Sequence, residues 1–261
     1  MPSLDYTADV RRESDRFSEC LQAADPAAPV PSCPGWNAAD LLWHLTQVQL
    51  FWARIVGERT QQPDDAGEAE RPDAPYSELL DGFRRATEGL LDTLASADDA
   101  ERVWTWADDQ SVGFIRRRQA HEALIHRLDA ELTIGQVTPL EPLLAADGVD
   151  EALHVMFGGY PAWATFTPSG GLGRVLATDT GRCWDCNLGR FSGTSPHTGK
   201  TYDEPTLEMH GALSTSEPAF LASGTAAHLD AWLWGRREAP ELTGDRESTA
   251  WFGSLVAAGI Q

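Results

Sequence analysis

The chain has 261 residues, enough for one large domain or two modest ones, and its hydrophobic fraction of 42% is ordinary for a globular protein. Its formal net charge of −20 argues against nonspecific binding to nucleic acid or to anionic membranes, because both need a positive field. No apolar run is long enough to span a bilayer, and residues 1–12 lack the charged-then-apolar order of a signal peptide, so we expect a cytoplasmic protein.

The first half of the chain predicts four amphipathic helices, because apolar residues recur there at helical spacing. Asn37 is a good N-cap for the second helix, with Asp40 at the third helical position. Residues 61–75, rich in Pro, Asp, Glu and Gly, predict a loop before the third helix. Helices of this length, with one long and two shorter connections, indicate a four-helix bundle over residues 1–138. The predicted helices cover residues 4–24, 37–56, 77–95 and 112–134.

Residues 139–261 have the pattern of a small α+β domain, so the predicted fold class is α+β with the helical bundle first. A short helix near 148–157 precedes strand-like segments that are separated by Gly-rich turns. The polar residues 190–205 predict a loop. The predicted strands cover residues 174–178, 183–188 and 206–212, and further helices cover 225–237 and 248–258.

The cysteines predict free thiols rather than a disulfide framework, because a cytoplasmic chain is kept reduced. Two of them form a Cys-Trp-Asp-Cys sequence, but a zinc ribbon needs a second such pair and the sequence has none. A redox pair belongs at the start of a helix, whereas this segment has the pattern of a strand, so we assign it no function. The four cysteines are Cys20, Cys33, Cys183 and Cys186.

Three residues of the predicted bundle point to metal chemistry. Glu122 and His126 are four residues apart on the fourth helix, which places them on one face, roughly 40° apart around the axis. His44 lies on the apolar stripe of the second helix. If His44 faces the other two, the three form a two-histidine, one-carboxylate site. Such a site suits zinc or a similar divalent ion with a position open for water or a substrate.

Each of these residues also has an ordinary structural explanation. A single histidine on an apolar helix face is more often a hydrogen-bonded core residue than a ligand. Glu122 can pair with Arg118 one turn earlier as a helical salt bridge, although such a pair does not require His126. His121 points about 100° away from Glu122 around the helix. The His-Glu-x-x-x-His string is also one residue too long for the metalloprotease pattern.

Three parts of the chain resemble the mycothiol-dependent maleylpyruvate isomerase family, within the DinB-like superfamily. They are Ser-Cys-Pro-Gly-Trp-Asn at 32–37 with Asp-Leu-Leu-Trp-His-Leu at 40–45, residues 117–131, and residues 223–237 with Leu-Thr-Gly-Asp at 242–245. The resemblance implies a DinB-like four-helix bundle that carries a metal, followed by a small sterol-carrier-like α/β domain. It also implies that His44, Glu122 and His126 are the ligands and that the thiol mycothiol is activated at a divalent metal, usually zinc.

Further residues are candidates for supporting roles. Arg118 and Asp129 lie on the same side of the predicted fourth helix as the ligand pair, where they can orient the ligands. Trp43 stands where the family more often has a small residue, and Trp104 and Trp106 lie in the connection before the fourth helix. These tryptophans either pack the core and anchor the loop, or form an aromatic pocket for a substrate larger than maleylpyruvate.

The leading functional hypothesis is an S-transferase that activates a mycothiol-type thiol as a thiolate for attack on a small electrophile. One alternative is a cis–trans isomerase of the maleylpyruvate type, in which the thiolate adds to a double bond and leaves again. The other alternative is a non-catalytic protein that binds a metal or a small ligand, since fold and site do not fix activity. We expect the thiol and the electrophile as partners, neither nucleic acid nor membrane, and a monomer or homodimer.

Overall fold

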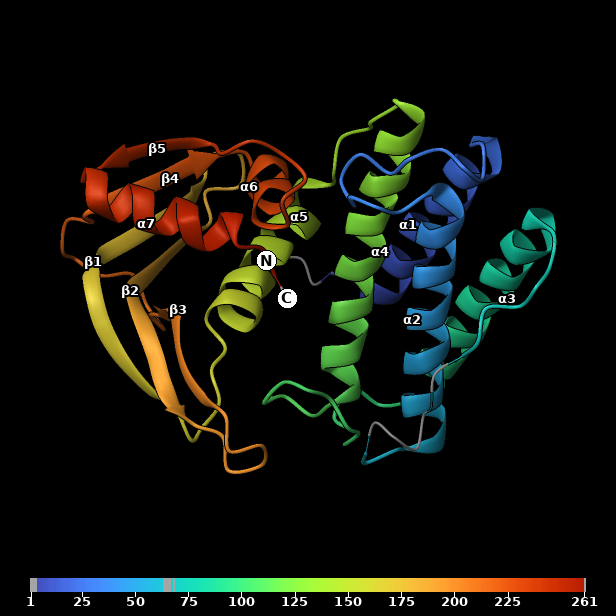
Figure 1. Cartoon of the computed structure of the whole chain (residues 1–261), viewed down its shortest axis with the longest axis horizontal. Helices are drawn as coiled ribbons and strands as arrows, with labels where there is room; N and C mark the ends of the chain where they lie inside the picture. The colour runs from blue at the N-terminus through green and yellow to red at the C-terminus, as the bar shows by residue number, and fades with distance from the viewer. Residues whose placement is uncertain (1–3, 63–66, 68, 261) are drawn as a thin grey trace. The chain divides into compact units, whose positions relative to one another are not determined.

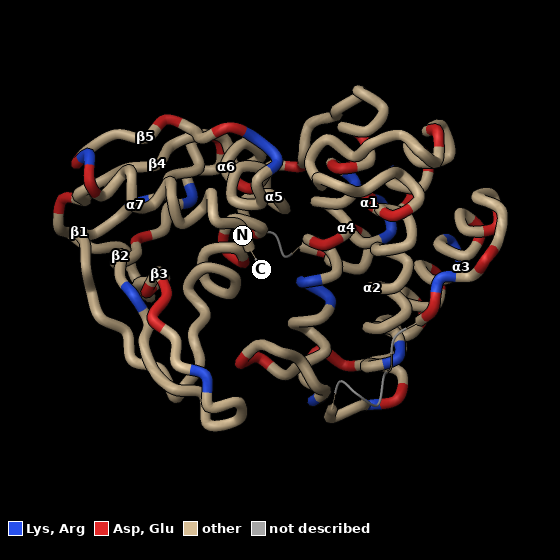
Figure 2. Tube along the Cα trace, viewed as in Figure 1, with Lys and Arg blue, Asp and Glu red and all other residues tan. Residues whose placement is uncertain are grey.

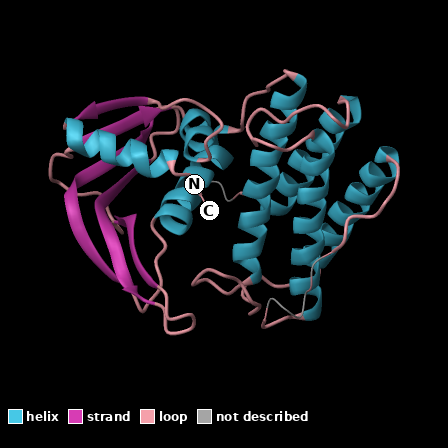
Figure 3. Ribbon diagram, in the orientation of Figure 1, coloured by secondary structure: helices cyan, strands magenta, loops and turns pink. Residues whose placement is uncertain are grey.

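The computed structural model describes residues 4–62, 67 and 69–260. The chain divides into two compact units, Met1–Pro139 and Leu140–Gln261. The first unit is built from helices, and every strand of the described residues lies in the second (Figure 3). The predicted α+β class, with a helical domain ahead of an α/β domain, is confirmed. Among the described residues, no helix is both long and apolar enough to cross a membrane.

All four predicted helices of the first unit are present (Figure 1). The Asn37 side chain accepts from the Asp40 N–H (2.9 Å), and the Asp40 carboxylate accepts from the Asn37 N–H (3.1 Å). This capping box starts the second helix. Of the predicted loop at 61–75, residues 63–66 and 68 lie outside the described residues, and its described part contains neither helix nor strand. The helices are α1 (Tyr6–Ala23), α2 (Ala38–Glu58), α3 (Tyr76–Ala95) and α4 (Val112–Ile134).

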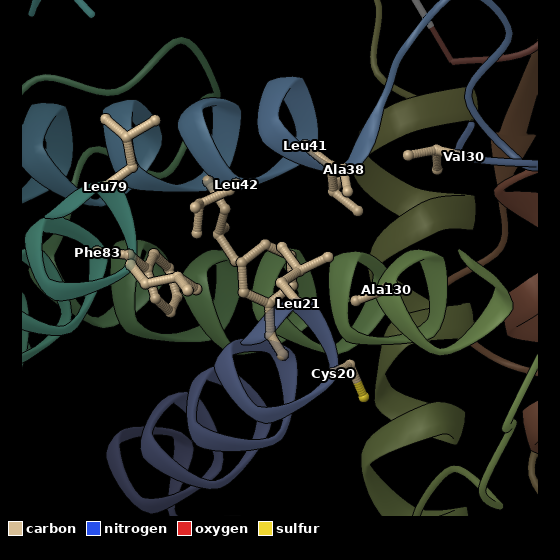
Figure 4. Close-up of a cluster of buried hydrophobic side chains, with 12 residues drawn as sticks. Cys20, Leu21, Val30, Ala38, Leu41, Leu42, Leu79, Phe83 and Ala130 are labelled. Carbon is tan, nitrogen blue, oxygen red and sulfur yellow. The ribbon is translucent and has the colours of Figure 1, made fainter. Parts of the chain in front are cut away.

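Apolar side chains from all four helices fill the centre of the bundle (Figure 4). Phe17 of α1 and Phe83 of α3 are buried there, with ring centroids 4.9 Å apart. On α2, Leu41 and Leu45 are buried in the same cluster. His44 lies at the margin of this apolar face, because 35% of its side chain is exposed. The stripe of α2 therefore places His44 beside the core rather than inside it.

A buried ion network ties α1 to the C-terminal half of α4. Arg127 Nε donates to Glu13 Oε2 (2.8 Å), and Arg127 Nη1 donates to Glu131 Oε2 (3.0 Å) and to Thr138 Oγ1 (2.7 Å). Glu131 also accepts from Arg16 Nε at 2.9 Å. Glu13 is 3% exposed and Glu131 is fully buried, so both carboxylates depend on these donors to offset the cost of burial. The network thus attaches α1 to α4 at Arg127 and Glu131, directly after the candidate ligand His126.

The elements of the second unit are α5 (Pro142–Glu151), the π-helical turn η2 (Ala152–Phe157), β1 (Thr165–Ala177), β2 (Cys183–Thr194), β3 (Thr201–Met209), β4 (Phe220–Gly224), α6 (Ala226–Leu233), β5 (Glu241–Gly244) and α7 (Arg246–Ala257). Its strands form a five-stranded mixed sheet in the order β3-β2-β1-β4-β5. The pair β1–β4 is parallel and the other neighbours are antiparallel. Phe252 of α7 contacts both Phe220 of β4 and Trp232 of α6, at centroid distances of 4.9 and 5.5 Å, so both helices help to cover the sheet.

The strands are longer and more numerous than the sequence pattern predicts. The predicted loop at 190–205 is wrong for most of its length, because its two ends extend β2 and β3 and leave only residues 195–200 as a turn. The predicted strand at 174–178 is the end of β1, which begins at Thr165. The sequence pattern of β1 is weak because the strand contains glycines such as Gly173. Packing explains this glycine, since a Cβ at position 173 would collide with the ring of Phe220. A glycine that lowers strand propensity is thus required by the tertiary contact.

Candidate functional site

The structure brings His44 of α2 together with Glu122 and His126 of α4. One candidate ligand atom from each residue lies within 4.8 Å of the other two. Glu122 Oε1 is 3.1 Å from His126 Nε2 and 3.6 Å from His44 Nε2. The two imidazole rings meet edge to face, with centroids 4.8 Å apart. We call these three residues the His/Glu cluster.

Arg118 lies one helical turn before Glu122 and binds its second carboxylate oxygen. Arg118 Nη2 donates to Glu122 Oε2 at 2.8 Å, and Arg118 is only 4% exposed. It belongs to a basic segment of α4, residues 116–118 (Figure 2). Burial opposes ionisation of Glu122, but the charge of Arg118 and the hydrogen bond with His126 outweigh burial and hold the pKa of this carboxyl well below its usual value. Glu122 is therefore an anion whose Oε1 faces the histidines.

Asp129 binds the opposite side of the His126 ring. Its Oδ2 is 2.9 Å from His126 Nδ1, and Asp129 is fully buried. Burial by itself would lower the pKa of His126, but the hydrogen bonds with Asp129 and Glu122 outweigh it and raise this pKa to about 9. Since Asp129 accepts from Nδ1–H, Nε2 is the nitrogen directed at the cluster. Metal-ligating histidines commonly show this arrangement.

Residues just before α2 also reach the cluster, and helical spacing does not predict these contacts. Ser32 Oγ donates to Asp129 Oδ1 at 2.5 Å, and Cys33 Sγ lies 3.6 Å from Asp129 Oδ2. The Trp36 ring packs on the His44 ring, with centroids 4.9 Å apart and an interplanar angle of 52°. The one signal for these residues in the sequence was the family resemblance of the Ser-Cys-Pro-Gly-Trp-Asn segment.

The three tryptophans proposed to line a pocket have different environments. Trp43 directly precedes His44 on α2 and is half-buried. Trp104 stacks on Trp52, with centroids 6.0 Å apart and an interplanar angle of 15°. Trp106 is 49% exposed and meets Phe114 edge to face. Trp104 is thus held by other aromatic rings, whereas much of Trp106 is accessible.

Other chemistry-bearing residues lie outside the His/Glu cluster. His121 is buried, and its ring packs edge-on against Tyr6 of α1. Cys183 and Cys186 are three positions apart on β2, and an odd separation on a strand places side chains on opposite faces. Burial raises the pKa of Cys186 to about 12. A fully buried thiol in this state is a poor nucleophile.

The first unit matches a known protein family. Residues 7–131 match the model of the mycothiol maleylpyruvate isomerase N-terminal domain, which is nearly the whole helical unit. The helical unit is therefore similar to the N-terminal domain of that family. A comparison with curated protein sequences finds no significant match.

Two solved structures have a similar fold over the whole chain. One is a crystal structure of the mycothiol-dependent maleylpyruvate isomerase, 12% identical, covering 92% of each chain with a TM-score of 0.58. The other is a histidine-to-alanine mutant of that enzyme, also 12% identical over 92% of each chain, with a TM-score of 0.55. At this identity the similarity establishes the fold, including the order of a helical unit followed by an α/β unit.

Proposed function

We propose that the chain is a divalent-metal-dependent enzyme that activates a mycothiol-type thiol, with His44, Glu122 and His126 as the metal ligands. The observation that carries the proposal is the convergence of three ligand atoms from two helices within 4.8 Å of one another. The match of residues 7–131 to the model of the mycothiol maleylpyruvate isomerase N-terminal domain supports the thiol as cosubstrate.

The donor set fits zinc. Metal–ligand distances near 2.0–2.2 Å in a tetrahedral site place neighbouring ligand atoms about 3.3 Å apart. Glu122 Oε1 lies 3.1 and 3.6 Å from the Nε2 atoms of His126 and His44, so both distances from the carboxylate are close to this spacing. Three protein ligands leave one of four positions for a substrate atom, as in catalytic rather than structural zinc sites.

The chain's own residues prepare the cluster for this role. Arg118 keeps Glu122 ionised, and Asp129 directs Nε2 of His126 inward. The ion itself supplies one chemical function, which is to lower the pKa of a thiol so that a thiolate is available at neutral pH. As part of the proposal, Trp43, Trp104 and Trp106 border the site where the electrophile binds.

Isomerisation and S-transfer are the two candidate reactions. In both, the thiolate adds to one carbon of an activated double bond, and the π electrons move onto the activating group. Isomerisation results when the former double bond rotates and the thiolate is expelled again. S-transfer results when the neighbouring carbon takes up the proton that the thiol lost, so that the thioether remains. The structures of similar fold are those of an isomerase, which favours isomerisation. The family match ends at residue 131, so it includes the three proposed ligands and does not extend into the second unit. S-transfer therefore stays as the second candidate.

Product analysis tests this proposal. We would incubate the metal-loaded protein with mycothiol and maleylpyruvate, and then with a panel of other unsaturated electrophiles, and identify products by mass spectrometry. A product of unchanged mass and altered geometry supports isomerisation, and a thioether adduct supports S-transfer.

Two variants of α4 serve as the test and its control. His126→Ala should abolish turnover, whereas His121→Ala, which alters a buried histidine of the same helix outside the cluster, should retain it. Full metal loading without thiol-dependent turnover of any electrophile would instead indicate a non-catalytic binding protein.

A further inference from the structure

We infer that the segment Ser32–Trp36 is a positioning loop that holds both histidines of the His/Glu cluster. The inference rests on the proposed function, because those histidines are proposed metal ligands. It gives a role to Ser32, Cys33 and Trp36, none of which is itself a proposed ligand.

The loop reaches His126 through Asp129. Ser32 Oγ donates to Asp129 Oδ1 (2.5 Å), which leaves Oδ2 to accept from His126 Nδ1 (2.9 Å) and from the Cys33 thiol (3.6 Å). Asp129 is fully buried, and a buried carboxylate is stable as an anion only when such donors surround it. By fixing the rotation of Asp129, Ser32 fixes the orientation of the His126 ring.

The same loop reaches His44 through Trp36. The Trp36 ring covers one side of the His44 ring at a centroid distance of 4.9 Å. The cover restricts a side chain of which 35% is exposed, and the His126 ring packs on the His44 ring at a centroid distance of 4.8 Å. Asn37 follows directly and caps α2, so the end of the loop also sets the start of the helix that carries His44.

Backbone hydrogen bonds make the loop rigid. Val30 N–H donates to Trp36 C=O (3.0 Å), Cys33 N–H donates to Val30 C=O (3.1 Å), and Trp36 N–H donates to Cys33 C=O (3.0 Å). Gly35 has a φ of +87°, which glycine adopts without strain. Val30 belongs to the apolar cluster of Figure 4 and anchors the loop in the core. The loop is thus a fixed bridge between the start of α2 and Asp129 on α4.

Zinc affinity of Ser32 variants tests the bridge to His126. We would remove metal from the full chain, add zinc back in competition with a chelator, and compare the parent with Ser32→Ala and Ser32→Thr. Ser32→Ala should weaken zinc binding about tenfold, as loss of a residue that orients a ligand does elsewhere. Ser32→Thr should bind zinc with the affinity of the parent, because threonine keeps the hydroxyl group.

Ser14→Ala is the control, since Ser14 is a serine of the same helical unit, more buried than Ser32, and its hydroxyl accepts a hydrogen bond from Gln49 (2.9 Å) rather than contacting the cluster. It should leave zinc affinity unchanged. Equal affinities for Ser32→Ala and Ser14→Ala would overturn the inference.

Backbone strain tests the loop as a unit. Gly35→Ala introduces strain at a positive φ where the new methyl group meets no atom within 4 Å, and it should weaken zinc binding. Gly181→Ala introduces the same kind of strain at a φ of +71°, also in open space, but in the turn between β1 and β2. This control should leave zinc affinity at the parent value. Equal zinc affinities for the two glycine variants would contradict the rigid-bridge account.

A metal-free readout separates this inference from the proposed function. In the parent, the Nδ1–H proton of His126 should exchange slowly with water in nuclear magnetic resonance spectra, because Asp129 accepts from it. Ser32→Ala should speed that exchange, and Ser14→Ala should not. A parent chain that binds no zinc would refute the proposed function. An unchanged exchange rate of this proton in Ser32→Ala would refute the positioning loop, whether or not zinc binds.

Discussion

Arg127→Met probes the buried ion network that joins α1 to α4. The substitution removes the N–H donors to Glu13, Glu131 and Thr138 while it roughly keeps the apolar stem. Removing one partner of a buried ion pair costs about 3–5 kcal/mol, because the other charge is left without compensation. Glu131 keeps its bond from Arg16, so we expect the lower end, about 3 kcal/mol. For a unit of this size that corresponds to a fall in Tm of roughly 10 °C.

Arg11→Met is the matched control for this measurement. It removes the same kind of side chain and charge from α1, the helix that the network joins to α4, but the Arg11–Glu88 pair is exposed, at 48% and 56% of the two side chains. Exposed pairs contribute little, so the control should unfold close to the parent. Thermal unfolding followed by far-ultraviolet circular dichroism reports the helices of the bundle. A loss of Tm in Arg127→Met no larger than in Arg11→Met would refute the reasoning.

The remaining predictions concern the ligands, the pH dependence and the substrate site. Asp129→Asn should lower zinc affinity roughly 10- to 100-fold in a calorimetric titration, and unchanged affinity would remove Asp129 from the site. Burial opposes ionisation of Glu131, but its hydrogen bonds with Thr138 and Arg16 lower its pKa. The ionised Glu131 carboxylate therefore stabilises the folded state above about pH 4.5, and this contribution is lost as the pH falls through its lower pKa in the folded state. Glu131→Gln should therefore make the free energy of unfolding fall less steeply as the pH is lowered. An equally steep acid limb in that variant would show that other carboxylates dominate. Trp106→Ala should raise KM for the electrophile with little change in Tm, because the residue is 49% exposed, and an unaltered KM would place it outside the substrate site.

Local patterns predicted the helical unit and placed Glu122 and His126 on one face of a helix, but they left open whether His44 faces that pair. The apolar stripe of α2 and the four-residue spacing on α4 are properties of single helices, so the sequence pattern alone indicated which residues share a face. The family resemblance pointed to the same three residues and also implied that α2 and α4 pack together. Helical spacing placed His44 on the apolar face, whereas the side chain lies at the edge of that face with 35% exposed.

The supporting contacts could not be predicted from spacing. Ser32 and Asp129 are 97 positions apart, and their contact depends on a loop conformation that has no period. The ion network around Arg127 could not be predicted from spacing either, because its partner Glu13 lies on another helix. In the sheet, Gly173 weakened the sequence pattern that would have predicted the full length of β1. A glycine is needed there because the ring of Phe220 on the neighbouring strand β4 occupies the space of a Cβ. In each case a tertiary contact, rather than local propensity, determines the residue.

Elemental analysis of the purified chain and of His126→Ala tests the central claim most directly. We expect about one divalent ion per parent chain, a similar content in His121→Ala, and nearly complete loss in His126→Ala. A full complement of metal in His126→Ala would contradict the assignment of the His/Glu cluster as the metal centre.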